Sequence, residues 1–187
     1  MERRTDSAPM KLSSVEYEKI EIRVVKLYID LNLTRIPINP FEVAKRLGYI
    51  VKRYSDMPND TRRELKMCAE DGCSFFNPDL GTWVIFYDDC MPHVRIRFTI
   101  MHEIGHILLE HRHESELARK MADYFAAYAL VPSPLMGYSK CEDFTEVADR
   151  FDVSTDCAYI CFQRFMNWRM YGGNIKQYEI DLLDLFS

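Results

Sequence analysis

The chain has 187 residues, which is enough for one ordinary domain with a buried core. Hydrophobic residues make up 48% of it and charged residues 28%, and this balance excludes an intrinsically disordered chain. The formal net charge is -5. Proteins that bind nucleic acid mainly through its phosphates carry basic surfaces, so we expect no direct DNA binding.

No segment indicates export or a membrane anchor. The first 14 residues are polar and lack the apolar stretch of a signal peptide, and no run approaches the roughly 18 apolar residues of a spanning helix. The six cysteines include no CxxC pair, which favours reduced thiols over a zinc ribbon or a thioredoxin-like site. We therefore expect a cytoplasmic protein with no membrane partner.

The order of predicted elements indicates the α+β class, with a mainly helical domain and a small antiparallel sheet of three strands. Apolar periodicity and turn residues define the elements. In chain order they are a helix at 15–31, a turn at 36–40, a helix at 41–47, a strand at 49–54, a polar loop at 55–70, a hairpin with strands at 72–77 and 82–88, and helices at 95–112, 114–130, 144–151 and 155–171, the last ended by Gly172 and Gly173. The acidic and apolar tail at 178–186 is expected to be a closing strand or a frayed end, or else to dock a partner or the protein's own cleft.

Nothing marks a boundary between two domains, so residues 1–187 are expected to form one unit, with residues 1–14 flexible. Residues 142–187 are expected to form a C-terminal helical subregion that has the spacing of a helix-turn-helix. Its second helix begins with Ser154, Thr155 and Asp156, and lacks the basic or amide side chains that read DNA. Packing against the rest of the domain is therefore the expected role.

All five histidines lie between His93 and His113, and residues 102–106 read His-Glu-Ile-Gly-His, a match to H-E-x-x-H. On a helix, His102 and His106 project from one face, where one nitrogen of each can bind a single Zn²⁺. Glu103 is then placed to take a proton from a water beside the metal without binding the metal itself. These three residues predict a zinc-dependent protease with Glu103 as its general base.

A catalytic zinc takes a third protein ligand, and the helix predicted at 114–130 is the place to look for it. Asp123 is the first candidate and Glu116 the alternative, because the two are seven residues apart and share a helical face. A donor for the developing oxyanion is also needed, and we consider four nearby side chains for it. They are His111, His113, Tyr124 and Tyr128. The strand at 82–88 is the candidate edge on which a peptide substrate adds as an extra strand.

Five segments of the chain carry a likeness to a known family. They are residues 36–44, 72–78, 83–87, 97–109 and 122–132, and the fourth contains H-E-x-x-H. On these segments the chain resembles the ImmA/IrrE family of zinc metallo-endopeptidases. The resemblance implies a zincin-like fold with the sheet over the active-site helix, and bound Zn²⁺. As substrate it implies a helix-turn-helix transcriptional repressor of a phage or mobile element, whose cleavage derepresses genes.

One position departs from that family. Four residues before the Asn or Asp of the last segment, such families usually carry a glutamate as the third zinc ligand, and here that position is Arg119, a cation that cannot bind zinc. Met121 likewise stands where an acidic residue is common. Either a nearby carboxylate substitutes or the metal is held weakly. The alternative function is a non-proteolytic protein, an antirepressor or sensor, that binds a regulator without cutting it.

Overall fold

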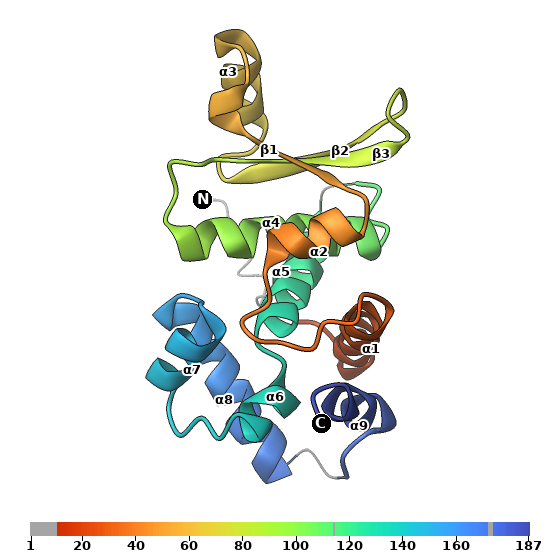
Figure 1. The fold of residues 1–187 in the computed structure, drawn as a ribbon, viewed down its shortest axis with the longest axis vertical. Helices are drawn as coiled ribbons and strands as arrows, with labels where there is room; N and C mark the ends of the chain where they lie inside the picture. Colours follow the sequence, from red (N-terminus) through yellow and green to blue (C-terminus); the bar gives the residue numbers. More distant parts are fainter. Residues whose placement is uncertain (1–10, 114, 172–173) are drawn as a thin grey trace, which may run out of the picture.

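The computed structural model describes residues 11–113, 115–171 and 174–187 (Figure 1). The predictions for most of residues 1–14 and for a helix end at Gly172 and Gly173 lie outside the described residues. Helices dominate and one small sheet accompanies them, which confirms the α+β class. The elements are α1 (Ser14–Asp30), α2 (Pro40–Arg46), β1 (Ile50–Arg53), the 3-10 turn η1 (Tyr54–Asp56), α3 (Asn59–Cys68), β2 (Gly72–Asn77), β3 (Thr82–Tyr87), α4 (His93–Leu108), α5 (Glu116–Leu130), α6 (Ser133–Tyr138), α7 (Phe144–Phe151), α8 (Thr155–Tyr171) and α9 (Gln177–Asp184).

The sheet has the order β1-β3-β2 and is mixed. β2 and β3 form the predicted antiparallel hairpin, in which Phe75 lies opposite Val84. β1 pairs with β3 in parallel, with Ile50 opposite Val84, so the prediction of a wholly antiparallel sheet is wrong. A parallel pair needs a long crossover, and η1, α3 and β2 supply it here. Because β3 lies between the other two strands, it is also not the free edge predicted at 82–88; β2 is an edge.

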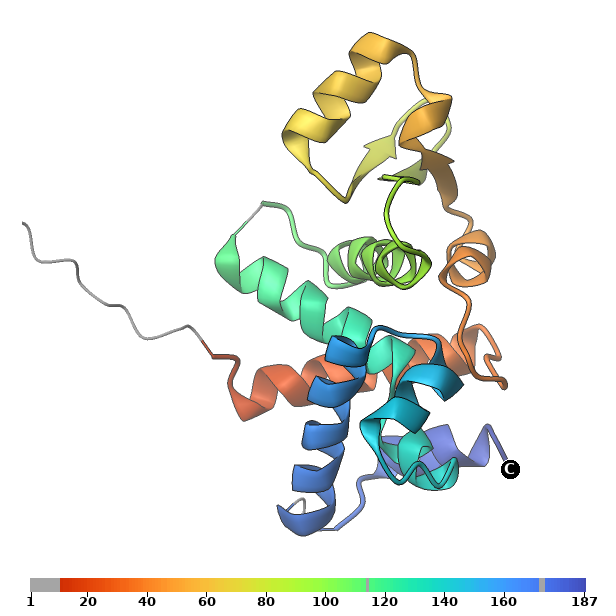
Figure 2. The same cartoon turned by 90° about the vertical axis from the view of Figure 1, so that its left-hand side faces the viewer.

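The sheet covers α4 on one side, and α3 lies beyond the other side (Figures 1 and 2). Gly72 is the point of closest approach between β2 and α4. A Cβ at this position would lie 2.5 Å from Thr99 Cγ2 and 2.8 Å from the Phe86 carbonyl oxygen. The absence of a side chain at residue 72 therefore lets β2 lie directly over α4.

A second glycine governs the packing of α4 against α5, which lies on the other side of α4 from the sheet (Figure 2). A Cβ on Gly105 would lie 2.9 Å from Cδ1 of the buried Phe125 ring. Helix α5 starts sharply, because the Ser115 hydroxyl accepts a hydrogen bond from the Ala118 amide. The Gly105 contact thus sets the distance between the two helices, and the Ser115 cap sets where α5 begins.

Arg97 ties α4 to the C-terminal helices. Its side chain is buried, and its guanidinium donates to the backbone carbonyls of Ile38, Phe151 and Asp152. It also forms an ion pair with the Asp152 carboxylate at 3.1 Å. The helix-turn-helix-like pair α7 and α8 is therefore attached to the rest of the chain through α4, as the packing prediction expected.

Three elements were missed or misassigned from the sequence. α3 lies where a polar loop was predicted, because only Leu65 of this helix is buried and it shows no apolar periodicity. α6 begins within a proline-rich segment that was taken only as a stop signal, with Pro134 in its first turn. The tail predicted as a strand or a frayed end is helix α9, which packs on α1 through a hydrogen bond from Tyr178 to Glu21. Among the described residues, no helix is long and apolar enough to cross a membrane.

Gly105→Ala is expected to lower the free energy of unfolding by about 1–3 kcal/mol, because the added methyl group overlaps Phe125. Gly137→Ala in α6 is the matched control, since its Cβ would lie 3.5 Å from Phe165, an ordinary contact. That control should change stability by less than about 1 kcal/mol. Urea unfolding followed by circular dichroism measures both, and equal effects of the two variants would contradict this account of α4–α5 packing.

Candidate active site

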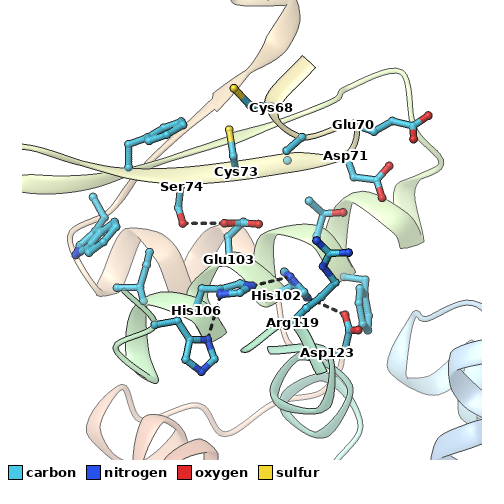
Figure 3. A pocket seen from close by; sticks show the side chains of 18 of the residues that line it. Cys68, Glu70, Asp71, Cys73, Ser74, His102, Glu103, His106, Arg119 and Asp123 are labelled. Atoms are coloured by element: carbon cyan, nitrogen blue, oxygen red, sulfur yellow. Dashed lines mark hydrogen bonds and ion pairs between the residues drawn. The ribbon is translucent and has the colours of Figure 1, made fainter. Parts of the chain in front are cut away.

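His102 and His106 lie one turn apart on α4 and line a pocket of about 820 Å³ between α4, α5 and the sheet. Their side chains turn toward each other, with 3.0 Å between the two Nε2 atoms (Figure 3). The helical spacing alone places the two rings on one face, as the motif predicted. The structure adds that both rings turn the same atom, Nε2, toward each other.

The outer nitrogens of both rings are also engaged. His102 Nδ1 lies 2.9 Å from Asp123 Oδ1 on α5, and His106 Nδ1 lies 3.1 Å from His111 Nδ1. An ionised carboxylate only accepts hydrogen bonds, so His102 Nδ1 carries the proton and the neutral ring has its lone pair on Nε2. That lone pair points toward His106.

Two nitrogen lone pairs 3.0 Å apart repel each other unless a proton or a cation lies between them. Two nitrogens that share one tetrahedral Zn²⁺ at about 2.0–2.1 Å would be separated by about 3.3–3.4 Å, close to the spacing found here. The donor set and its outer hydrogen bonds therefore fit a bound metal ion. Within residues 11–113, 115–171 and 174–187, no three His, Cys, Asp or Glu side chains are grouped closely enough to hold a metal by themselves.

Glu103 is 8% exposed and lies between α4 and the sheet. Ser74 on β2 donates a hydrogen bond of 2.7 Å from its hydroxyl to Glu103 Oε2 (Figure 3). Sequence reasoning missed Ser74, since a serine in a predicted strand carries no signal until the strand is laid over the helix. The edge strand thus orients the carboxylate that the motif singles out.

The two candidates for a third ligand lie in different places. Asp123 contacts the ring nitrogen of His102 that faces away from His106, which is not the nitrogen that a shared metal would use. Glu116 is exposed and does not line the pocket; Lys120 binds it at 2.6 Å, and this hydrogen bond lowers the pKa of the Glu116 carboxyl. Arg119, one turn before Asp123, does line the pocket. The structure therefore brings a cation to the face of α5 where the family resemblance places a ligand.

The four oxyanion candidates also separate. His111 and His113 line the pocket with the two facing histidines. Tyr124 donates its hydroxyl to Glu21 on α1, and Tyr128 is buried in the core, so neither tyrosine belongs to this pocket. Of the four side chains considered as oxyanion donors, His111 and His113, which follow α4, therefore remain as candidates.

A family comparison covers this whole arrangement. The model of the IrrE N-terminal-like domain, a peptidase family, matches residues 50–160. The chain belongs to this family. No curated protein matches the chain. The match runs from β1 into α8, so the sheet, α4 and α5 are all peptidase-domain elements, and membership assigns the chain a metallopeptidase-type function.

The upper side of the peptidase-domain sheet carries a half-buried thiol. Cys73, next to Ser74 on β2, points away from the histidines and toward Cys68 (Figure 3). Its Sγ lies 3.7 Å from the hydroxyl of Tyr54, which also donates to the Ala69 carbonyl. Burial raises the pKa of the Cys73 thiol to about 11, although the contact with Tyr54 works in the opposite direction. At neutral pH this cysteine is therefore a neutral thiol that packs the roof of the site.

The rate of alkylation of Cys73 by iodoacetamide should rise about tenfold per pH unit up to pH 10 without levelling off, because the thiolate is the reactive form. The raised pKa keeps that form scarce over this range. Peptide mass spectrometry of timed samples measures the rate. In urea, where burial is lost, the rate should level off near pH 9. A plateau well below pH 10 in the folded chain would show that burial does not act on this thiol.

Proposed function

We propose that the chain is a zinc-dependent endopeptidase in which His102 and His106 hold the metal and Glu103 is the general base. The observation that carries the proposal is the pair of facing Nε2 atoms 3.0 Å apart, with Asp123 and His111 on the outer nitrogens. Two imidazoles with oriented outer nitrogens suit zinc among the common metals. The family match supports the peptidase class.

A zinc ion bound there would polarise the scissile carbonyl and ease the deprotonation of an attacking water near neutral pH. Glu103 removes a proton from that water as its oxygen bonds to the carbonyl carbon, and then delivers the proton to the departing amine as the C–N bond breaks. Ser74 holds Oε2 of the carboxylate, which fixes the direction in which Glu103 faces the pocket. His111 and His113 are the nearby donors for the developing oxyanion.

The edge strand β2 is where we place the substrate backbone. Gly72, Cys73, Ser74 and Phe75 of this strand line the active-site pocket. Within the described part of the chain, β2 pairs only with β3, so its other edge is open to an extended peptide. A peptide added there lies above the histidines and beside Glu103.

For the substrate we keep the helix-turn-helix transcriptional repressor of a phage or mobile element, cut in the cytoplasm to derepress genes. What supports this choice is the ImmA/IrrE likeness of the motif segments together with the family match over residues 50–160. The net charge of -5 agrees with a protein partner rather than DNA.

A second function is favoured by one observation, the presence of Arg119 in the active-site pocket. A guanidinium near the metal position repels a dication and supplies no ligand. A chain that holds zinc too weakly to work would still present the β2 edge to a peptide. It would then act as an antirepressor or sensor that binds a regulator without cutting it.

The affinity for zinc distinguishes the two functions, and we expect that affinity to depend on the residue at position 119. Arg119→Glu should tighten zinc binding by about tenfold or more, because it replaces a repelling cation with a carboxylate on the pocket-facing side of α5. Lys120→Glu makes the same change in charge at the next residue, which does not line this pocket, and should change the affinity by less than about threefold. Competition with a chromophoric chelator measures both constants. Equal effects of the two variants would mean that residue 119 does not face the metal.

Glu103→Gln should abolish cleavage of a helix-turn-helix repressor that the unchanged chain cuts, with a loss of at least about 100-fold in rate, while zinc binding persists. Glu110→Gln is the control, since Glu110 follows α4 and is exposed. Gel electrophoresis of timed incubations gives the rates. Cleavage that survives Glu103→Gln would remove the general-base assignment. Zinc binding without any cleavage by the unchanged protein would favour the non-proteolytic function.

A further inference from the structure

A second pocket adjoins the active-site pocket. It has a volume of about 760 Å³ and lies between the chain just before α1 and parts of α4, α5 and α8. We name it the side groove and define it by Leu12, Tyr17, Phe98, Tyr124, Ile160 and Arg164. Three residues line both pockets: Arg95, Phe98 and Asp123. The side groove is therefore continuous with the place where the histidines lie.

The floor of the side groove is apolar. Tyr17 and Tyr124 meet edge to face with 4.5 Å between ring centroids, and Leu12 packs in the core beside them. Ile160 on α8 is 50% exposed, although it lies within this concave surface. An apolar surface of this kind gains free energy when it takes a side chain out of water, at roughly 25 cal/mol per Å². The groove thus suits an aromatic or aliphatic side chain.

One wall of the side groove carries a cation. The guanidinium of Arg164 lies 4.8 Å above the Tyr124 ring, and among the described residues no carboxylate comes within ion-pair distance of it. A guanidinium stacked on a ring keeps its N–H edge available for a carboxylate.

The other charges of the groove are largely matched with one another. Arg95 is paired with Asp71, and Lys120 with Glu116. Asp123 is held by His102. The remaining charged groups of the lining are Lys11, Asp156 and Arg164. Asp123 keeps its charge because the His102 ring is neutral, so two cations face two carboxylates in this lining. Arg164, stacked on the Tyr124 ring, is the group that favours a negatively charged ligand.

We infer that the side groove is a substrate subsite that takes an apolar side chain followed by an acidic one, with Arg164 binding the carboxylate. This inference rests on the proposed peptidase function, because the continuity of the two pockets makes a peptide the occupant. A peptide that leaves the histidines over Phe98 and Asp123 enters the groove directly. Arg164 is then a specificity-determining residue that lies outside the reacting centre.

Three short probes test the inference by nuclear magnetic resonance on the ¹⁵N-labelled full chain. They are acetyl-Phe-Glu-amide, acetyl-Phe-Gln-amide and acetyl-Ser-Glu-amide. The first should shift the amide signals of Tyr124, Ile160 and neighbouring residues in a saturable manner. The second lacks the charge and the third lacks the apolar side chain, so each should bind about tenfold more weakly.

Arg164→Gln should remove the preference for Glu over Gln, and Arg164→Lys should keep part of it. Arg169→Gln is the matched control on the same helix, because Arg169 lies over the Phe165 ring and does not line the groove. Ile160→Ser should weaken the two Phe probes and leave the Ser probe unchanged. Equal binding of the Glu and Gln probes by the unchanged chain, an unaltered preference in Arg164→Gln, or shifts confined to other surfaces would each overturn the inference.

The titration requires neither zinc nor turnover, so it fails independently of the proposed function. A chain that cleaves its repressor but shows no preference among the probes overturns the subsite alone. A chain that shows the preference but neither binds zinc nor cuts overturns the proposed peptidase function. The groove would then select the same apolar and acidic peptide for a protein that binds it without cutting.

Discussion

The contact of α4 with α5 at Gly105 is the constraint on which the site depends. Because residue 105 has no side chain, Phe125 packs directly against α4. At this distance Asp123, on the same helix as Phe125, reaches His102 Nδ1. Gly72 does the same on the opposite side, where it lets β2 descend until Ser74 bonds to Glu103. Helix α4 thus carries His102, Glu103 and His106. The close contacts at Gly105 and Gly72 bring Asp123 and Ser74 near enough to orient two of them.

Local pattern was enough to predict the three residues of H-E-x-x-H, because their relative positions depend only on the geometry of one helix. It was also enough for both ends of α7 and for the start of α8, which match the predicted ranges. The predictions that failed concern features set by contacts between distant parts of the chain. The parallel pairing of β1, the edge position of β2 and the role of Ser74 follow from a crossover that no local window contains. α3 buries a single residue, so the burial that marks most helices in a sequence is absent from it.

At the proposed metal site, two neighbouring turns of α5 would act on a bound cation in opposite senses. Asp123 accepts a hydrogen bond from His102, which makes the ring a better ligand and fixes its orientation. Arg119 brings a positive charge to the same pocket. Because Arg119 is exposed, water and salt screen much of its effect, whereas the hydrogen bond from His102 acts at contact distance. We therefore expect Arg119 to weaken zinc binding at the proposed site without abolishing it.

The burial of Glu103 bears on whether that site cuts or only binds. Placing a carboxylate between a helix and a sheet costs free energy unless partners or a function offset it. Glu103 is only 8% exposed, and its carboxylate accepts a hydrogen bond from the Ser74 hydroxyl. Ser74 belongs to β2, the strand on which we place the substrate. A protein that merely holds a peptide on β2 gains nothing from an acid beneath that strand and beside two imidazoles. A base poised against a bound peptide does need that position, so the burial of Glu103 and its contact with Ser74 support the proposed hydrolysis.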